Sequence, residues 1–376
     1  MINSKTFLTL LVTLIARSVL SQTEVQWAVE FGGDELEEGT SIDVDIAGNV
    51  YVTGYFESVM DFDPSIDEEL IFEPYEVGTK TSYVTKFDAF GELVWSRALG
   101  YGEPKEILVD DSGNCYMIGI FRGVSDFDST EDELILAVTG STYNTYIIKF
   151  SPTGDFIWHK VFGNGPSYAY AADIYNNDFL YITGYVGDSA DFNYGGEPHI
   201  VNDLEGSNFL VKMDVDGNLL WSTTFGGDGT DIICYDLSLG PDSEIWMTGQ
   251  IDGIGDFKPG PETLIDDAYE DVFVLKLDAT GSFEWYGEFE RAFSDATGWG
   301  IKVDNEGSAH IVGSHTNGFD LDPGFGVFNV LSYGGFAHED VFVIKLNEFG
   351  EFLWGGTLGG PNPDWGYGID VDNESN

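Results

Sequence analysis

Short runs of alternating hydrophobic and polar residues recur along the whole chain. They are rich in Val, Tyr, Thr, Phe and Trp, which is typical of β-strands. In residues 40–99, one run leads through a tight turn at Gly48-Asn49 into a second run, and a later pair is joined by the turn "AFGE". Such Gly-containing turns favour antiparallel hairpins. No segment shows helical periodicity, so the pattern predicts an all-β chain made of hairpin pairs.

The strand pattern repeats with a period of about 65 residues, which indicates a repeat architecture. Three residue types mark the same register. Tryptophan recurs at 27, 95, 158, 221, 285 and 354, glycine at 54, 119, 184, 249 and 313, and lysine at 86, 149, 212, 276 and 345. We expect complete four-strand units at about 40–99, 105–162, 168–225, 231–289 and 298–358, and partial strands at 25–31 and 366–373.

Both faces of each predicted sheet are apolar. In "DVFVLKL", Phe273, Leu275 and Leu277 point to one side of the strand, and Val272 and Val274 point to the other. A four-stranded sheet cannot cover two apolar faces by itself. Sheets that pack face to face around an axis solve this problem, so the repeat predicts a β-propeller of four-stranded antiparallel blades.

The elements "GNVYVTGYF", "DFDP", "DVFVLKLD", "GEFLW" and "FGG" resemble the bacterial β-propeller repeat (SBBP) family. They are also similar to NHL-type propeller repeats, and the resemblance covers residues 22–376. It implies an exported protein without an assigned reaction, so no family residue is carried over as catalytic. By analogy with NHL-type blades, the first strand of each unit is innermost and the Trp-bearing strand is outermost.

This analogy implies five complete blades and a split, incomplete sixth blade built from residues 25–31 and 366–373. The last residues, "DVDNESN", correspond to the middle of a hairpin turn. We therefore expect a truncated C-terminus and a natural ring of six or more blades, with a five-bladed ring with frayed ends as the alternative.

Composition narrows the choice of partner. The chain carries 15 basic and 66 acidic residues, a formal net charge of −51, which disfavours nucleic acids and anionic membranes. Residues 1–21 read as a signal peptide and no later segment is a candidate membrane span, so we expect a secreted or cell-surface protein. Cys115 and Cys234 form no metal or redox motif, and we expect both to be free and buried.

A recurring acidic element follows the second strand of each unit. In extended chain, side chains two residues apart point the same way, so two oxygen ligands could converge on a cation. Outside the cell Ca²⁺ is the natural candidate, because it accepts oxygen ligands in loose geometry. The alternative is that each Asp caps the strand end and bonds loop amides. The candidate ligands are Asp61, Asp63, Asp126, Asp128, Asp191, Asn193, Asp320 and Asp322.

The sequence lacks a nucleophile elbow, an HExxH motif and a phosphate-binding loop. We expect the recurring Lys and Trp to pack between blades. The sequence therefore favours an acidic binding or adhesion scaffold without catalysis, with no certain cofactor and an extracellular protein or glycan as partner. The alternative is an extracellular polysaccharide hydrolase or lyase, with residues 163–170 and the region from His310 to His315 as its best candidates.

Overall fold

The computed structural model shows an all-β chain without an α-helix among the residues that it describes. The signal-peptide prediction and Asp128 lie outside those residues. The described residues are 27–33, 36–65, 69–76, 78–127, 135–138, 142–163, 165–187, 189–194, 196–202, 207–226, 231–258, 265–289, 295–333, 335, 338–372 and 375.

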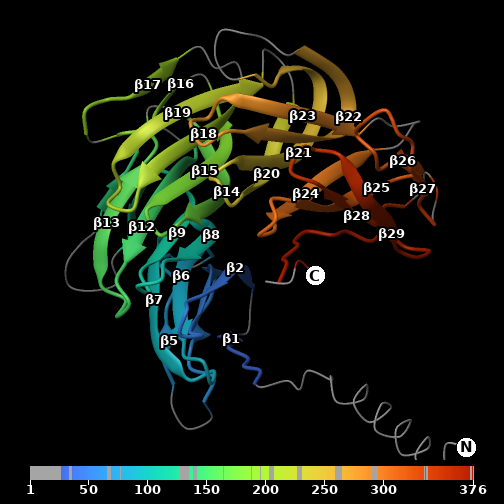
Figure 1. Cartoon of the computed structure of the whole chain (residues 1–376). Helices are drawn as coiled ribbons and strands as arrows, with labels where there is room; N and C mark the ends of the chain where they lie inside the picture. The colour runs from blue at the N-terminus through green and yellow to red at the C-terminus, as the bar shows by residue number, and fades with distance from the viewer. Residues whose placement is uncertain are drawn as a thin grey trace, which may run out of the picture.

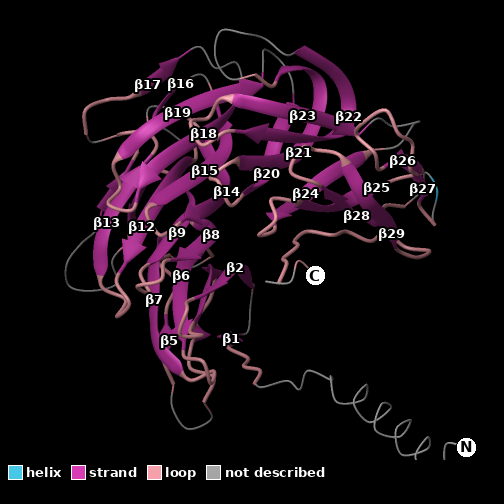
Figure 2. Ribbon diagram, in the orientation of Figure 1, coloured by secondary structure: helices cyan, strands magenta, loops and turns pink. Residues whose placement is uncertain are grey.

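Five four-stranded antiparallel units follow one another along the chain, each with its strands in sequence order (Figure 2). A single residue pair, Gly226 with Asp256, joins the third and fourth units into one larger sheet. We number the units one to five. Their strands are β2 (Glu37–Val44), β3 (Val50–Phe56), β6 (Thr81–Phe87) and β7 (Leu93–Tyr101); β8 (Glu103–Val109), β9 (Cys115–Phe121), β12 (Asn144–Phe150) and β13 (Phe156–Val161); β14 (Ser167–Tyr175), β15 (Phe179–Val186), β18 (Ser207–Asp214) and β19 (Leu219–Gly226); β20 (Asp231–Leu239), β21 (Ile245–Asp256), β22 (Ile265–Leu277) and β23 (Phe283–Phe289); and β24 (Ala296–Val303), β25 (Ala309–His315), β28 (Asp340–Leu346) and β29 (Phe352–Leu358).

Short hairpins extend these units beyond the second strand. Two-residue and three-residue strands pair beside the main sheets and carry the recurring acidic element. They are β1 (Gly32–Gly33), β4 (Met60–Asp61), β5 (Ile71–Phe72), β10 (Val124–Asp126), β11 (Ile135–Ala137), β16 (Ser189–Asp191), β17 (Ile200–Asn202), β26 (Gly318–Asp320) and β27 (Asn329–Leu331).

The recurring glycine of the second strand faces a β-bulge in the first strand. At Gly249, for example, the pairing with β20 skips Tyr235, and the carbonyl oxygen of Ile233 then occupies the space of a β-carbon. Equivalent bulges skip Thr40, Lys105, Tyr170 and Trp299. Glycine is required at this position because any side chain would collide with the bulged backbone.

The recurring tryptophan packs each of the first four units onto the next one. Trp95 lies against Gly154 in the turn between the last two strands of the second unit, and its Nε1 donates a hydrogen bond to Pro152 O at 3.0 Å. Trp158 repeats this arrangement with Gly217 and Val215 O in the third unit, at 3.2 Å. The repeated lysine strengthens the contact, since Lys86 Nζ donates to the same Pro152 O at 3.2 Å.

The five units are arranged as an arc whose first strands, β2, β8, β14, β20 and β24, lie on the inside (Figure 1). These five strands line one common cavity together with residues 368–370. The C-terminal end of the described chain therefore lies between the fifth unit and the first (Figure 1).

Neither predicted partial strand is a β-strand in the residues that the structure describes. Residues 27–31 and 366–372 are irregular, because the described chain offers them no neighbouring strand with which to form a ladder. Their side chains nevertheless take repeat positions. Trp27 Nε1 donates to Ala89 O at 3.0 Å in the first unit, as Trp95 does in the second, and Lys302 Nζ of β24 lies 3.8 Å from the Asp370 carboxylate.

Cys115 and Cys234 are free and buried, as expected. Burial raises the pKa of each thiol to about 12, so both behave as small apolar side chains at neutral pH. Within the described part of the chain, no helix is long and apolar enough to cross a membrane.

Candidate functional site

The central cavity has a volume of about 710 Å³ and is lined by the first strands of all five units. Four carboxylates, those of Asp43, Glu106, Asp173 and Asp236, belong to this lining, together with Asp370 of the C-terminal segment. Lys302 is the one cationic side chain among the described lining residues. The cavity is therefore a strongly acidic environment in the middle of the molecule.

Three of the cavity carboxylates tie consecutive first strands together. Asp43 Oδ2 accepts a hydrogen bond from Val109 N of the next unit at 2.7 Å. Asp173 accepts one from Leu239 N at 3.0 Å, and Asp236 accepts one from Ile301 N at 2.8 Å. Since splayed strands around an axis do not form a ladder, these side chains satisfy backbone donors that would otherwise lack partners.

Burial makes the cavity carboxylates weak acids. It raises the pKa of Glu106 to about 8 and the pKa of Asp236 to about 7, against the opposing effect of their hydrogen-bond donors. The pKa of Asp43 and that of Asp173 are raised for the same reason. At neutral pH the cavity thus retains protons on Glu106 and, in part, on Asp236.

A row of four aromatic side chains joins three of the first strands, β14, β20 and β24, to the C-terminal segment. Three members are the bulge residues Tyr170, Tyr235 and Trp299, and the fourth is Tyr367 of the C-terminal segment. Successive ring centroids are 6.0, 4.6 and 5.6 Å apart, so the four rings form one continuous row. Tyr235 directly precedes Asp236 in β20, although the four aromatic residues are not among the residues that line the cavity.

The rings of the row are held in place but remain partly accessible. Trp299 Nε1 donates to Ser314 Oγ at 3.1 Å, which fixes the indole at the start of β24. Burial raises the pKa of Tyr170 to about 12 and also raises that of Tyr235, so both phenols stay neutral. Tyr367 is 66% exposed. A row of neutral aromatic faces, on strands that also carry Asp173 and Asp236, is suited to hold organic cations.

The acidic elements after the second strands bond to their own loops. Asp61 Oδ1 accepts hydrogen bonds from Asp63 N at 3.0 Å and Leu70 N at 2.9 Å. Asp191 bonds Asn193 N and His199 N in the same way. This is the capping arrangement that the sequence left open as the alternative to a metal site.

The last of these elements repeats the pattern, with Asp320 Oδ1 accepting from Asp322 N and Phe328 N, and Asp322 accepting from Gly324 N. Asp126 likewise has an interaction partner. The part of the chain that the structure describes contains no group of three or more His, Cys, Asp or Glu side chains placed to hold a metal ion. The Ca²⁺ site stays a prediction.

The repeated lysines are bound to neighbouring turns and carboxylates. Lys149 Nζ donates to Val215 O at 2.9 Å, and Lys276 Nζ donates to Glu348 O at 3.0 Å. Lys345 Nζ lies 2.8 Å from Asp304 Oδ2, and Lys86 Nζ lies 3.9 Å from Asp45. These contacts give the lysines a structural role between and within units.

The candidate residues of the hydrolase alternative are engaged in internal hydrogen bonds. His310 Nε2 lies 3.1 Å from Asp304 Oδ2, and the buried Ser167 Oγ donates to Phe162 O at 3.1 Å. His315 is fully buried, and its Nε2 lies 3.0 Å from Thr357 Oγ1. The hydrolase or lyase activity stays a prediction.

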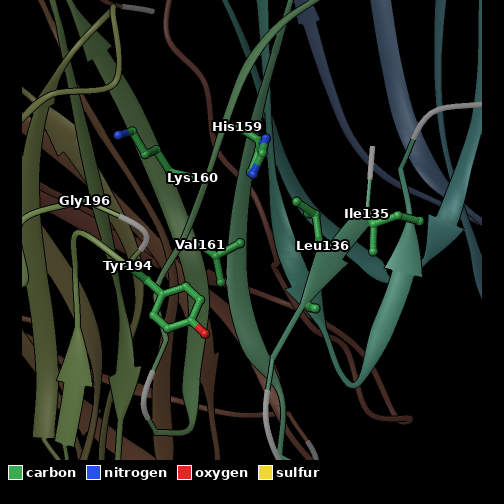
Figure 3. Close-up of a pocket in the computed structure, with 8 residues that line it drawn as sticks. Ile135, Leu136, His159, Lys160, Val161, Tyr194 and Gly196 are labelled. Atoms are coloured by element: carbon green, nitrogen blue, oxygen red, sulfur yellow. The ribbon is translucent and has the colours of Figure 1, made fainter. Parts of the chain in front are cut away.

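A second cavity, of about 360 Å³, lies between β11 and β13 of the second unit and Tyr194 and Gly196 of the third (Figure 3). His159 and Val161 of β13, Leu136 of β11 and Tyr194 of the third unit line it (Figure 3). Burial and the neighbouring Lys160 lower the pKa of His159, so its imidazole is neutral near pH 7. Tyr194 packs directly on Gly163, which leaves no room for a β-carbon there.

The central site was not identified from the sequence, although signals for it exist. A charged residue interrupts the apolar alternation of a first strand at Asp43, Glu106, Asp173 and Asp236. In three units the residue at the bulge is aromatic. Its spacing from the recurring glycine of the following strand marks its position in the sequence. Both signals can be interpreted only when the first strands are known to surround a cavity.

Comparison with known proteins supports the propeller assignment. Residues 26–55 match the family model of the SBBP β-propeller repeat. This confirms the recognition made from the repeat elements. The match covers Trp27, β2 and most of β3, including Thr40 at the first bulge and the recurring Gly54.

The chain is also similar to an uncharacterized WD repeat-containing protein of Acanthamoeba polyphaga mimivirus. The two are 20% identical over 96% of this chain. The chain spans 31% of the length of that relative. WD repeats are propeller repeats, so both comparisons support the same all-β, propeller-like architecture.

Proposed function

We propose that this chain is an exported β-propeller that acts as an acidic binding scaffold without catalysis. In this proposal, the central site takes ammonium groups of an extracellular protein or glycan. The propeller is supported by the five units, whose first strands line one cavity together with residues 368–370. Export is supported by the sequence of residues 1–21, and the preference for cations by the net charge of −51.

The observation that carries the proposal is that the aromatic row and the acidic cavity share strands β14, β20 and β24. Tyr235 and Trp299 have ring centroids 4.6 Å apart, and Asp236 lies on the same strand as Tyr235. An ammonium group gains both from an aromatic face and from a nearby carboxylate, and the gain is larger where water is excluded. The net charge of −51 disfavours phosphate and sulfate groups.

Isothermal titration with two families of probes tests the proposal. Tetralysine stands for a protein partner, and chitosan oligosaccharides stand for an amino glycan, with chitin oligosaccharides as the acetylated, uncharged control. We expect saturable binding of at least one cationic probe and none of the acetylated control. The cationic probe that binds more tightly, tetralysine or chitosan, identifies the class of partner.

Two pairs of variants distinguish binding of the probes at the central site from general attraction to an acidic surface. Tyr367→Ser removes an exposed ring of the row, and Tyr75→Ser removes a ring that is 50% exposed elsewhere. Asp236→Asn and Glu92→Gln each replace a carboxyl group by an amide, the first in the cavity and the second on an exposed turn. We expect Tyr367→Ser to weaken binding by about two- to fivefold, the worth of one exposed cation–π contact.

The matched controls should leave the affinity unchanged. Equal losses in both members of each pair would show that the probes bind the surface charge rather than the central site. Absence of binding by either cationic probe at low salt would overturn the proposed function.

A further inference from the structure

Four tyrosines of the first three units form a second row of rings, which we call the tyrosine row. Tyr101 is the last residue of β7, and Tyr143 directly precedes β12. Tyr168 is the second residue of β14, and Tyr185 is the last but one of β15. In an antiparallel unit the first and third strands begin where the second and fourth strands end, so all four residues lie at the same end of their units.

The rings of the tyrosine row are in contact and half-buried. The hydroxyl oxygens of Tyr101 and Tyr143 are 3.1 Å apart and share a hydrogen bond. The ring centroids of Tyr143 and Tyr168 are 5.8 Å apart, and those of Tyr168 and Tyr185 are 6.2 Å apart. The row is therefore a continuous, partly accessible aromatic surface that joins three units.

The guanidinium group of Arg122 lies on this row. Arg122 directly follows β9 and is exposed. Its Cζ is 5.5 Å from the ring centroid of Tyr101 and 5.3 Å from that of Tyr143. The two rings hold the guanidinium group in place but provide no oxygen acceptor on their faces for its five N–H donors.

Arg122 has no ion pair and no hydrogen bond to another residue in the part of the chain that the structure describes. By contrast, Arg97 Nε donates to Gly154 O at 3.1 Å and its Nη1 donates to Ser96 O at 2.9 Å. In a chain with 66 acidic and 15 basic residues, an unpaired guanidinium group is unusual. Its donors can therefore bind an external acceptor.

Two lysines beside the tyrosine row explain why the nearest carboxylate does not pair with Arg122. Lys80 Nζ is 3.2 Å and Lys105 Nζ is 3.4 Å from the carboxylate of the same residue, Glu103. Burial raises the pKa of Tyr101 to about 12, and Glu103 and Arg122 act on that pKa in opposite directions, so both charges lie near this ring. The site is thus a group of cations on an acidic molecule.

We propose that Arg122 and the tyrosine row bind a linear glycan that carries carboxylate groups, such as a chain of uronic acid residues. A guanidinium group pairs with a carboxylate through two parallel hydrogen bonds. Tyrosine faces pack against the apolar faces of sugar rings. Because Tyr168 and Tyr185 continue the row beyond Arg122, the surface matches a ligand in which rings and carboxylates repeat, which favours an acidic glycan over an acidic peptide.

Isothermal titration with tetragalacturonic acid tests the proposal. The salt concentration is about 0.15 M, at which charges more than about 8 Å away are largely screened. The methyl ester of the probe keeps the sugar rings and removes the charges, whereas tetraglutamate keeps the charges and has no sugar rings. We expect saturable binding of the acid, and binding of each control that is at least about tenfold weaker.

Variants of the chain locate the binding. Arg122→Gln should weaken binding of the acid by at least about tenfold, and Arg122→Lys should weaken it less, because an ammonium group keeps the charge and loses the paired geometry. Tyr168→Ser should weaken binding by about two- to fivefold. Lys160→Gln on β13 and Tyr75→Ser, whose ring is 50% exposed, are the controls for charge and ring, and both should bind as the parent chain does.

Absence of binding by the acid, equal affinity for the methyl ester or for tetraglutamate, or unchanged affinity in Arg122→Gln would each overturn the proposal. The site does not rest on the proposed function, because the central site is tested with the cationic probes tetralysine and chitosan. Failure of one site and failure of the other are therefore distinguishable.

Discussion

The indole of Trp95 lies over Gly154 of the following unit and donates a hydrogen bond to the carbonyl oxygen of Pro152 at 3.0 Å. The same contact recurs from unit to unit, so the repeated sequence produces the same packing between neighbouring units. A β-carbon on Gly154 would lie 2.8 Å from the ring, so the turn must be glycine for the units to meet. The contact explains why tryptophan and turn glycine recur together along the chain.

Truncation of Trp95 to alanine should cost about 3–5 kcal/mol of unfolding free energy, because the side chain is 7% exposed and its removal leaves a cavity between two units. Urea unfolding of the variant measures this cost. Trp354→Ala serves as the matched control, since that ring is half exposed, and should cost less than about 1 kcal/mol. Equal costs at the two positions would show that the interface contact does not stabilise the fold.

Gly249→Ala should destabilise the chain by at least about 2 kcal/mol, because the new methyl group would overlap the carbonyl oxygen of Ile233 at the bulge. Thermal unfolding provides the measurement. Gly356→Ala in β29 is the control, because open space surrounds the corresponding β-carbon. That substitution should be neutral or slightly stabilising, since alanine loses less backbone entropy on folding.

The repeated units, their strand content and the buried cysteines could be predicted because each follows from local pattern. Alternation of apolar residues sets the strands, and turn glycines set the hairpins. Residues 366–372 carry the first-strand pattern but form no strand among the described residues, because a ladder also needs a partner. The central site was missed because Asp43 and Asp236 meet only when distant units surround one cavity.

The stability of the chain should fall as pH rises from about 4.5 to 8. Burial raises the pKa of Glu106 to about 8 and that of Asp236 to about 7 in the folded state, above their ordinary values of 4.5 and 3.8. The folded chain therefore binds these protons more tightly than the unfolded chain, and the stability that they provide is lost as pH rises through the folded-state pKa.

Glu106→Gln should flatten this dependence, because glutamine stays neutral across the range. Denaturant unfolding from pH 5 to pH 9 measures how the free energy of unfolding depends on pH. Glu92→Gln on an exposed turn is the control. A slope that is the same in Glu106→Gln and in the parent chain would contradict the assignment of the proton to Glu106.

Capping alone predicts that Ca²⁺ leaves the melting temperature unchanged, whereas the predicted Ca²⁺ site requires that it rise. Asp61 and Asp320 each already accept two backbone hydrogen bonds through one oxygen, which explains their recurrence without a metal. Thermal unfolding in millimolar Ca²⁺ and in EDTA tests this expectation. A higher melting temperature in Ca²⁺ would instead support the paired-carboxylate site, because a ligand of the folded state raises stability by mass action.

The proton count of cation binding tests the central claim most directly. Tetralysine is titrated into the chain at pH 7 in two buffers of different ionisation enthalpy, and the difference in heat gives the number of protons exchanged. The account predicts net proton release, because an ammonium group beside Asp236 and Glu106 lowers their raised pKa values. Binding without proton release, or release that persists unchanged in Asp236→Asn and Glu106→Gln, would contradict it.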